Sequence, residues 1–288
     1  MSADDGAVIG ATKILDHGPD KQCWNMAIVG DGYLETQLPR YHTDVDNFVD
    51  RFLNTPPFDS LSRGINIYRI DVVSVEEGAD LPVECNVPGI YRRTYFDATF
   101  CSRGPGGQRY ERLLTVNDSL VIDVVKRFVP LRRQVLAIVN SSKYGGSGGQ
   151  RVATFSTHAQ SAEIGIHEMG HSAFQLGDEY GGDGTGTPLG EPAQPNVTRN
   201  TNRATNKWRT LVAGTTPMPS ACNAVCTASA CVPPASPPPA GAVGTYEGGL
   251  YSECNIYRPL PSCYMRDYKP FCPVCSSVIE RVLLPFQP

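Results

Sequence analysis

Residues 163–180 read EIGIHEMGHSAFQLGDEY, and the interpretation of the whole chain starts from this stretch. It contains the pattern His-Glu-x-x-His at His167, Glu168 and His171. The apolar residues around the pattern, and Ser161 as a candidate N-cap, predict a helix, on which residues four apart share a face. Two imidazoles about one turn apart can bind one metal ion, typically zinc at about 2.0–2.1 Å. The alternative, two histidines side by side in an apolar core, would leave both needing a polar partner.

Glu168 gives the pattern its chemical meaning. It lies one step round the helix from His167, close enough to polarise a water molecule on the ion without binding the ion itself. This division of labour is typical of metal-assisted hydrolysis, in which the glutamate is the general base.

The third ligand has to come from beyond the helix. Asp178 is seven residues after His171, about 10 Å further along an unbroken helix, which is out of reach. We therefore expect the chain to turn near residues 175–177, with Gly177 in a left-handed conformation. Asp178 would then complete a set of two histidines and one carboxylate with an open position for water. Glu179 is the rival ligand, and Glu191 is a further alternative.

Several stretches together carry a family resemblance. HEMGHSAFQLGDEY resembles the zinc signature of the IgA-peptidase-like metallopeptidases, a family related to the metzincins. Similar motifs run in order from about residue 24 to 284, which leaves the first few residues and a Pro-rich insert near 213–242 unmatched. They are VGDGY (29–33), VNSSKYGG (139–146), PNVT (195–198), NKW (206–208), YEGG (246–249), CYMR (263–266) and FCPVC (271–275).

One departure from the metzincin pattern keeps the third ligand open. Three residues after the second histidine, where metzincins usually carry a glycine, this chain has Phe174, and its acidic residue comes one position later than their third ligand. The assignment of Asp178 rather than Glu179 as third ligand therefore has less support in the sequence than the assignment of the two histidines.

The resemblance implies a fold and an activity. The fold would be α/β, a metzincin-like two-lobed zinc peptidase, with a mixed twisted sheet and helices in the N-terminal lobe and an irregular, disulfide-rich C-terminal lobe. Residues 1–288 would form a single catalytic domain, with lobes of about 1–176 and 177–288. The activity would be that of a zinc endopeptidase with one catalytic Zn²⁺, acting on protein or peptide substrates. Whether calcium is also bound is unknown.

The resemblance also implies roles for residues outside the helix. The strand before it would be an exposed edge against which a peptide lies as an added strand, at Thr154, Phe155 and Ser156. Met265 resembles the methionine turn beneath the zinc. Independently of the resemblance, Tyr268 and Arg266 follow it directly and are candidate donors to the developing oxyanion, with Tyr268 preferred. A different class of function stays open: a non-catalytic, secreted binding module with a structural zinc.

Composition limits the partners and the compartment. The net charge of −4 with scattered Lys and Arg argues against nucleic acid, and no apolar run reaches the length of a membrane span. We expect a monomer. Ten cysteines favour a secreted protein, although the start, MSADDGAVIGATK, lacks the pattern of a leader. We therefore expect the leader to have been removed or to lie outside this sequence; a cytoplasmic protein with reduced cysteines is the alternative.

The remaining sequence predicts alternating strands and helices. Strands are expected at 26–29, 65–75, 134–140 and 152–157, and helices at 43–53, 118–128 and 276–284, with a Gly-rich loop at 144–149. The spacing of Cys85 and Cys101 suits a disulfide, and the insert with Cys222, Cys226 and Cys231 is expected to be stapled. Cysteines also stand at positions 254, 263, 272 and 275, and together they could form a four-thiolate zinc site. We expect disulfides instead, because Cys254 and Cys263 lack the two-residue separation that Cys272 and Cys275 have.

Overall fold

The computed structural model describes residues 5–85, 89–104, 106–149, 151–182, 188–227 and 230–288. The chain divides into two units, the first formed by Met1–Ala173 with Leu283–Pro288 and the second by Phe174–Val282. Because the last six residues belong to the first unit, the C-terminus returns to it. There Gln287 Nε2 donates to the carbonyl of Leu61 at 2.7 Å.

The first unit is built on a six-stranded mixed sheet with the order β1-β3-β2-β4-β6-β5. Strands β3, β2, β4 and β6 are parallel, while β1 and β5 are antiparallel to their neighbours. The central strand β2 is buried along its whole length, as expected of a parallel strand covered on both faces. The strands are β1 (Gly6–Leu15), β2 (Trp24–Asp31), β3 (Ile65–Ser74), β4 (Arg132–Val139), β5 (Gly146–Gly148) and β6 (Ala153–Ser156).

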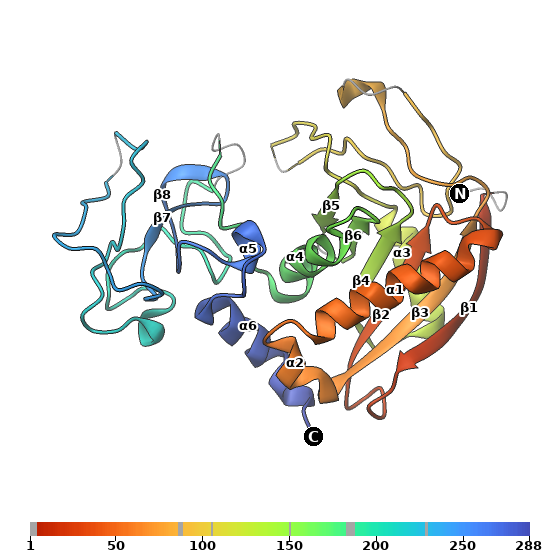
Figure 1. Ribbon diagram of the computed structural model, residues 1–288, viewed down its shortest axis with the longest axis horizontal. Coiled ribbons are helices and arrows are strands. Elements are labelled where there is room, and N and C mark those ends of the chain that lie inside the picture. The colour runs from red at the N-terminus through yellow and green to blue at the C-terminus, as the bar shows by residue number, and fades with distance from the viewer. Residues whose placement is uncertain (1–4, 86–88, 105, 150, 183–187, 228–229) are drawn as a thin grey trace. The chain divides into compact units, whose positions relative to one another are not determined.

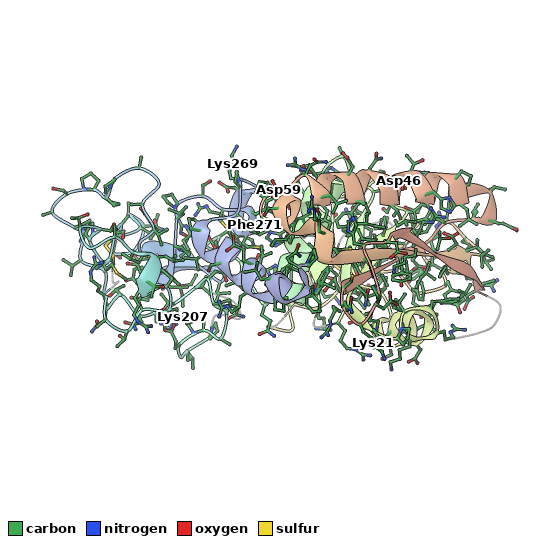
Figure 2. The ribbon with its side chains drawn as sticks, turned by 90° about the horizontal axis from the view of Figure 1, so that it is seen from below. Lys21, Asp46, Asp59, Lys207, Lys269 and Phe271 are labelled. Atoms are coloured by element: carbon green, nitrogen blue, oxygen red, sulfur yellow. A yellow bond between two sulfur atoms is a disulfide. The ribbon has the colours of Figure 1, made fainter. Side chains whose placement is uncertain are left out.

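Helices cover both faces of this sheet. Helix α1 (Leu38–Leu53) lies on one face and α3 (Asp118–Phe128) on the other (Figures 1 and 2). Apolar residues of α3 pack with Val29, Val72 and Val139 of the sheet in one core cluster. Charged side chains such as Asp46 of α1 point outward (Figure 2). Short helices follow at α2 (Phe58–Leu61), η1 (Glu35–Gln37), η2 (Ser62–Gly64), η3 (Val83–Cys85) and η5 (Leu284–Phe286).

Helix α4 (Ser161–Phe174) contains the His-Glu-x-x-His pattern and packs on the same face as α1. Gly165 allows the close approach, because a Cβ there would lie 2.8 Å from the ring of Phe48 and 2.9 Å from that of Phe155. Glu163 adds an ion pair with Arg51 of α1 at 3.2 Å. A helix held this tightly can keep its side chains in fixed positions.

The VGDGY motif serves the fold of the first unit. Asp31, at the end of β2, is fully buried and accepts hydrogen bonds from the backbone N–H groups of Phe96 and Ala98 at 2.9 and 3.0 Å. The hydroxyls of Thr94 and Ser74 donate to it at 2.8 and 3.2 Å. One carboxylate therefore fixes the segment around residues 94–98 against the sheet.

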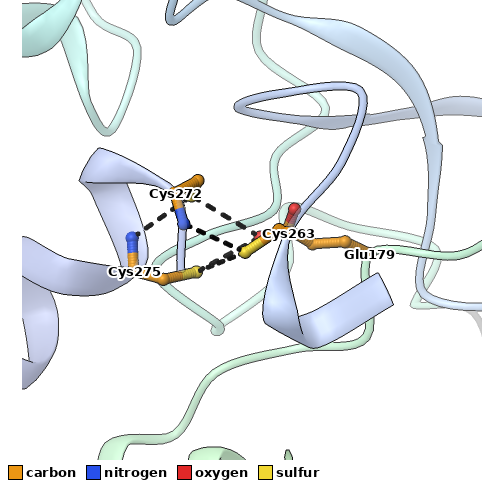
Figure 3. Close-up of side chains that lie close together, drawn as sticks. All are labelled: Glu179, Cys263, Cys272 and Cys275. Carbon is orange, nitrogen blue, oxygen red and sulfur yellow. Dashed lines mark hydrogen bonds between the residues drawn. The ribbon is translucent and has the colours of Figure 1, made fainter. Parts of the chain in front are cut away.

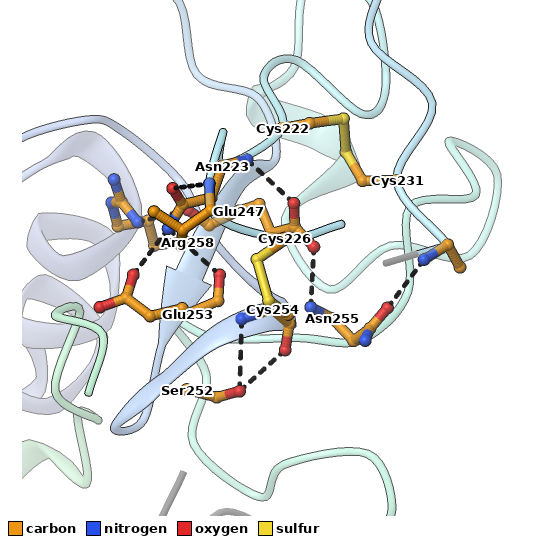
Figure 4. The surroundings of a disulfide bond; sticks show 12 residues. Cys222, Asn223, Cys226, Cys231, Glu247, Ser252, Glu253, Cys254, Asn255 and Arg258 are labelled. Atoms are coloured by element: carbon orange, nitrogen blue, oxygen red, sulfur yellow. Dashed lines mark hydrogen bonds between the residues drawn. A yellow bond between two sulfur atoms is a disulfide. The ribbon is translucent and has the colours of Figure 1, made fainter. Parts of the chain in front are cut away.

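The second unit has little regular structure. Strands β7 (Tyr246–Gly249) and β8 (Ser252–Arg258) form a two-stranded antiparallel sheet. The helices of this unit are η4 (Arg209–Leu211), α5 (Tyr264–Asp267) and α6 (Pro273–Leu283). Disulfides Cys222–Cys231 and Cys226–Cys254 staple the insert (Figure 4). Glu247 of β7 accepts from the backbone N–H of Asn223, which ties the insert to this hairpin (Figure 4).

Most predicted elements are confirmed, with corrections at their bounds. Helix α1 begins at Leu38 rather than at Thr43, because Pro39 suits a first helical turn. Strands β1, β5, β7 and β8 were not predicted; β5 consists of the Gly-Ser-Gly in the stretch expected to be a loop. The mixed α/β class and the Cys85–Cys101 disulfide are confirmed.

The prediction that the strand at residues 152–157 is an exposed edge was wrong. Strand β6 lies between β4 and β5, and Thr154, Phe155 and Ser156 are all buried. The backbone of β6 pairs on both sides, so it has no free ladder to offer a peptide. Strand β5 is the last strand in the sheet order, and Gly146 is bridged to Leu113 on its outer side. The sequence did not indicate this strand, because glycine is depleted in strands.

The disulfides expected in the C-terminal cysteine group were also mostly wrong. Cys254 pairs with Cys226 of the insert, whereas Cys263, Cys272 and Cys275 are free and buried, as is Cys23 in the first unit.

Among the described residues, no helix is both long and apolar enough to cross a bilayer.

Candidate metal centre

The two histidines of α4 face one another. Their Nε2 atoms are 3.2 Å apart, and their ring planes meet at 87°. Two ligands at about 2.0–2.1 Å from one ion, at a tetrahedral angle, would be about 3.3–3.4 Å apart. The separation of the nitrogens is therefore close to the edge of a tetrahedral metal site, and the pair fits a zinc ion as it stands.

Glu168 lies beside this pair. One of its carboxylate oxygens and the ring nitrogens of His167 and His171 all lie within 4.8 Å of one another. The side chains of His167 and Glu168 are buried, so little bulk water competes for them. A carboxylate this close can exchange a proton with a water molecule held next to the imidazoles.

Strand β5 packs against this part of α4 through its glycines. A Cβ at Gly148 would lie 2.5 Å from the Cβ of His171 and 2.6 Å from the carbonyl oxygen of Glu168. At Gly146, a Cβ would lie 3.0 Å from Glu168 Oε1. The two distances at Gly148 are too short for a real side chain, and the one at Gly146 would require Glu168 to shift. The Gly-rich stretch therefore allows the sheet to approach α4 closely, rather than serving as a flexible loop.

We expect Gly148→Ala to lower the activity of this site by about 10²-fold, beyond any loss of folded protein. The new methyl group pushes His171 away, and a shift on the order of 1 Å at a catalytic group has this size of effect. Gly10→Ala in β1 is the matched control, because nothing lies within 4 Å of a Cβ there. Turnover rates and circular dichroism of both variants test this. Normal activity of Gly148→Ala would show that the helix does not depend on this contact.

In the second unit, Asp178 is buried and its carboxylate is oriented by a tyrosine. The hydroxyl of Tyr251 donates to Asp178 Oδ2, and the backbone N–H of Leu250 donates to the carbonyl of Asp178 at 2.9 Å. Burial, and next the negative charge of Asp178, raise the pKa of Tyr251 above its usual range, so the hydroxyl remains a donor at neutral pH.

Tyr251 is a residue that the sequence analysis missed. It and Leu250 form the two-residue connection between β7 and β8, with φ angles of 61° and 45°. This left-handed turn normally favours Asn-Gly, so Leu-Tyr there costs roughly 1–3 kcal/mol per residue in backbone strain. The YEGG motif just before it gave no indication that the next residues contact an aspartate.

The turn after α4 differs from the prediction in one detail. The residue with a left-handed backbone is Gln175, with φ of 56°, and not Gly177. Gly177 is needed for close packing, since a Cβ there would lie 2.9 Å from Leu250 Cδ2. The side chain of Asn196 fixes this turn by bonding both the N–H and the carbonyl of Gly177, at 2.7 and 2.8 Å.

The rival ligands have other partners. Glu179 is fully buried, and its Oε1 accepts from Asn196 at 2.9 Å and lies 3.2 Å from the sulfur of Cys275. Glu191 accepts from Thr198 at 2.6 Å and forms an ion pair with Lys207 at 3.0 Å.

Met265 and Tyr268 lie in and just after α5 in the second unit. Met265 is fully buried, and its carbonyl accepts from the backbone N–H of Glu179 at 2.8 Å. Tyr268 ends α5 in a left-handed conformation, with its ring against that of Tyr264 at 6.0 Å between centroids.

A comparison with known protein families gives a match over most of the chain. A family model described as IgA Peptidase M64 matches residues 12–228, which is more than half of the chain. The chain belongs to the IgA peptidase M64 family. The match includes the whole of α4 and ends inside the Pro-rich insert, which was expected to be unmatched. No curated protein matches the chain.

Membership of the M64 family makes this protein a peptidase, and therefore a hydrolase that acts on proteins or peptides. The family also suggests a metal cofactor, and α4 supplies a group of side chains that can hold one. Three disulfides are in keeping with an extracellular location.

Proposed function

We propose that the protein is a zinc-dependent endopeptidase in which His167, His171 and Asp178 hold the ion and Glu168 is the general base. The observation that carries the proposal is the separation of 3.2 Å between the two Nε2 atoms, with a Glu168 oxygen inside the same group. Bound zinc lowers the pKa of a coordinated water toward neutrality and polarises the scissile carbonyl.

The roles of the protein groups follow from their chemistry. Glu168 takes the proton from the water that attacks the scissile carbonyl and then delivers it to the leaving amine. Tyr268 donates a hydrogen bond to the developing oxyanion. Met265 packs beneath the metal centre, a role that its complete burial supports.

The choice of Asp178 is supported by the other contacts around it. The carboxylate of Glu179 points into a group of cysteines, and that of Glu191 is engaged by Thr198 and Lys207. Asp178 instead has its Oδ2 oriented by Tyr251, as metal-binding carboxylates usually are by a neighbouring donor.

We further propose that the two units act as the lobes of a metzincin-like catalytic domain, secreted and monomeric. Substrate would add to the edge strand β5 rather than to β6. The backbone N–H and carbonyl of Gly146 point away from β6 and bond to Arg112 and Leu114. Because the backbone groups of successive strand residues alternate in direction, those of Gly148 also point away from β6. The polar groups of Gly148 are thus placed to pair with a peptide backbone.

Cleavage of a mixed peptide library, with and without a zinc chelator, tests the proposed function. We expect internal peptide bonds to be cut, cutting to stop with the chelator, and activity to return when zinc is added. Because backbone pairing reads few side chains, we expect several sequences to be cut rather than an antibody hinge alone. Cleavage that continues in the chelator would contradict a metal-dependent mechanism.

We expect Tyr251→Phe to lower kcat/KM by about 10- to 100-fold, the usual effect of removing a hydrogen bond to a metal ligand. The ring remains, so the hairpin should keep its fold. Tyr246→Phe is the matched control, because this hydroxyl, in the same hairpin, donates to the carbonyl of Ala242. Steady-state kinetics and zinc competition with a chelator measure the effect. Equal losses in both variants would count against a specific role for Tyr251.

A further inference from the structure

The second unit holds a buried group of side chains that the proposed catalysis does not use. Cys263, Cys272, Cys275 and Glu179 each point one ligand atom toward a common centre, and these atoms all lie within 4.8 Å of one another (Figure 3). All four residues are buried, and the three thiols are free.

Their separations match a tetrahedral zinc site. At a Zn–S distance of about 2.3 Å, two sulfurs would be about 3.8 Å apart, and a sulfur and an oxygen about 3.5 Å apart. The sulfurs of Cys263 and Cys275 are 3.7 Å apart. Glu179 Oε1 lies 3.2 Å from the sulfur of Cys275 and 4.0 Å from that of Cys272. The group is therefore already spaced for one ion.

The backbone around the group favours thiolates. The N–H of Cys272 donates to the sulfur of Cys263 at 3.3 Å, and the N–H of Cys275 donates to the sulfur of Cys272 at 3.4 Å. Cys272 also directly precedes α6, whose N-terminus stabilises a negative charge. Cys272-Pro-Val-Cys275 has the two-residue spacing of zinc-binding cysteine pairs.

Glu179 gives the strongest indication that this group binds a cation. Its side chain is fully buried, and within the described part of the protein its Oε2 atom has no hydrogen-bond partner. A carboxylate oxygen that is buried without a partner is unfavourable, whereas a bound cation would satisfy it. Disulfides cannot explain the group, since three thiols leave one unpaired.

We propose that Cys263, Cys272, Cys275 and Glu179 bind a second zinc ion, with a structural role. Four protein ligands close the coordination sphere, which is the mark of a structural rather than a catalytic site. The ion would tie together the segment at Glu179, the turn before Met265 and the start of α6. Three thiolates favour zinc over magnesium or calcium, which prefer oxygen.

The test is zinc content and zinc X-ray absorption of the purified protein, with His167→Ala/His171→Ala as the key variant. We expect two zinc ions per chain in the wild type and one in this double variant. The ion that remains should have three sulfurs at about 2.3 Å and one oxygen at about 2.0–2.2 Å. The wild type, which needs no substitution, should average about one and a half sulfur ligands per zinc.

Substitutions and thiol counting complete the test. Cys272→Ser should lose the sulfur-bound zinc, whereas Cys23→Ser, which removes the free buried cysteine of the first unit, should keep both ions. Protein unfolded with a chelator but without reductant should alkylate at four cysteines. A double variant without zinc, a wild-type spectrum without sulfur ligands, or alkylation at only two cysteines would overturn the proposal.

Failure of this inference can be told apart from failure of the proposed function. A chelator-sensitive peptidase whose only zinc has nitrogen and oxygen ligands would refute the cysteine site alone. A protein with sulfur-bound zinc but no peptidase activity would refute the proposed catalysis alone.

Discussion

Glu168→Gln is expected to lower peptide cleavage by at least about 10³-fold and to leave the zinc content unchanged. The amide has nearly the shape of the carboxylate but cannot accept a proton at neutral pH. General acid–base catalysis contributes about 10²–10⁴-fold, and Glu168 acts twice, on the water and on the leaving amine. Because Glu168 is not a proposed ligand, His167 and His171 should keep the ion.

Glu163→Gln is the matched control for this change. Glu163 lies in the first turn of the same helix, and its carboxylate pairs with Arg51 rather than with the histidines. Cleavage rates and metal analysis of both variants decide the matter. If Glu168→Gln retained full activity, or lost its zinc, the role of Glu168 as general base would be wrong.

Asp178→Ala is expected to remove the catalytic zinc and at least about 10³-fold of the activity. A metal ion stabilises the transition state by several kcal/mol, and each 1.4 kcal/mol is a tenfold change in rate. Metal content should fall by one zinc per chain, while the ion proposed at the cysteine group remains.

Glu191→Ala, which removes a rival ligand, should keep both the zinc and the activity, since Glu191 is engaged by Thr198 and Lys207. Loss of metal in Glu191→Ala together with its retention in Asp178→Ala would show that Glu191, and not Asp178, is the third ligand.

The sequence predicted those parts of the molecule that depend on local patterns. The His-Glu-x-x-His spacing, the apolar runs of β2 and β4 and the amphipathic pattern of α3 each determine an element through neighbouring residues. The structure has α3 at Asp118–Phe128, as predicted, because Asn117 caps it by accepting from the N–H of Leu120.

The missed features depend on contacts between residues far apart in the sequence. The Gly-Ser-Gly of β5 reads as a loop because its glycines are required by contact with α4, which no local pattern reveals. Tyr251 contacts Asp178 across 73 positions. Glu179 reads as a rival catalytic ligand, yet its partners Cys272 and Cys275 lie more than ninety positions away.

Anomalous diffraction at the zinc absorption edge, from crystals of the purified protein, tests the central claim most directly. The account predicts a peak within about 2.0–2.2 Å of the Nε2 atoms of His167 and His171 and of a carboxylate oxygen of Asp178. A strong zinc peak at the cysteine group with none at the two histidines would contradict it.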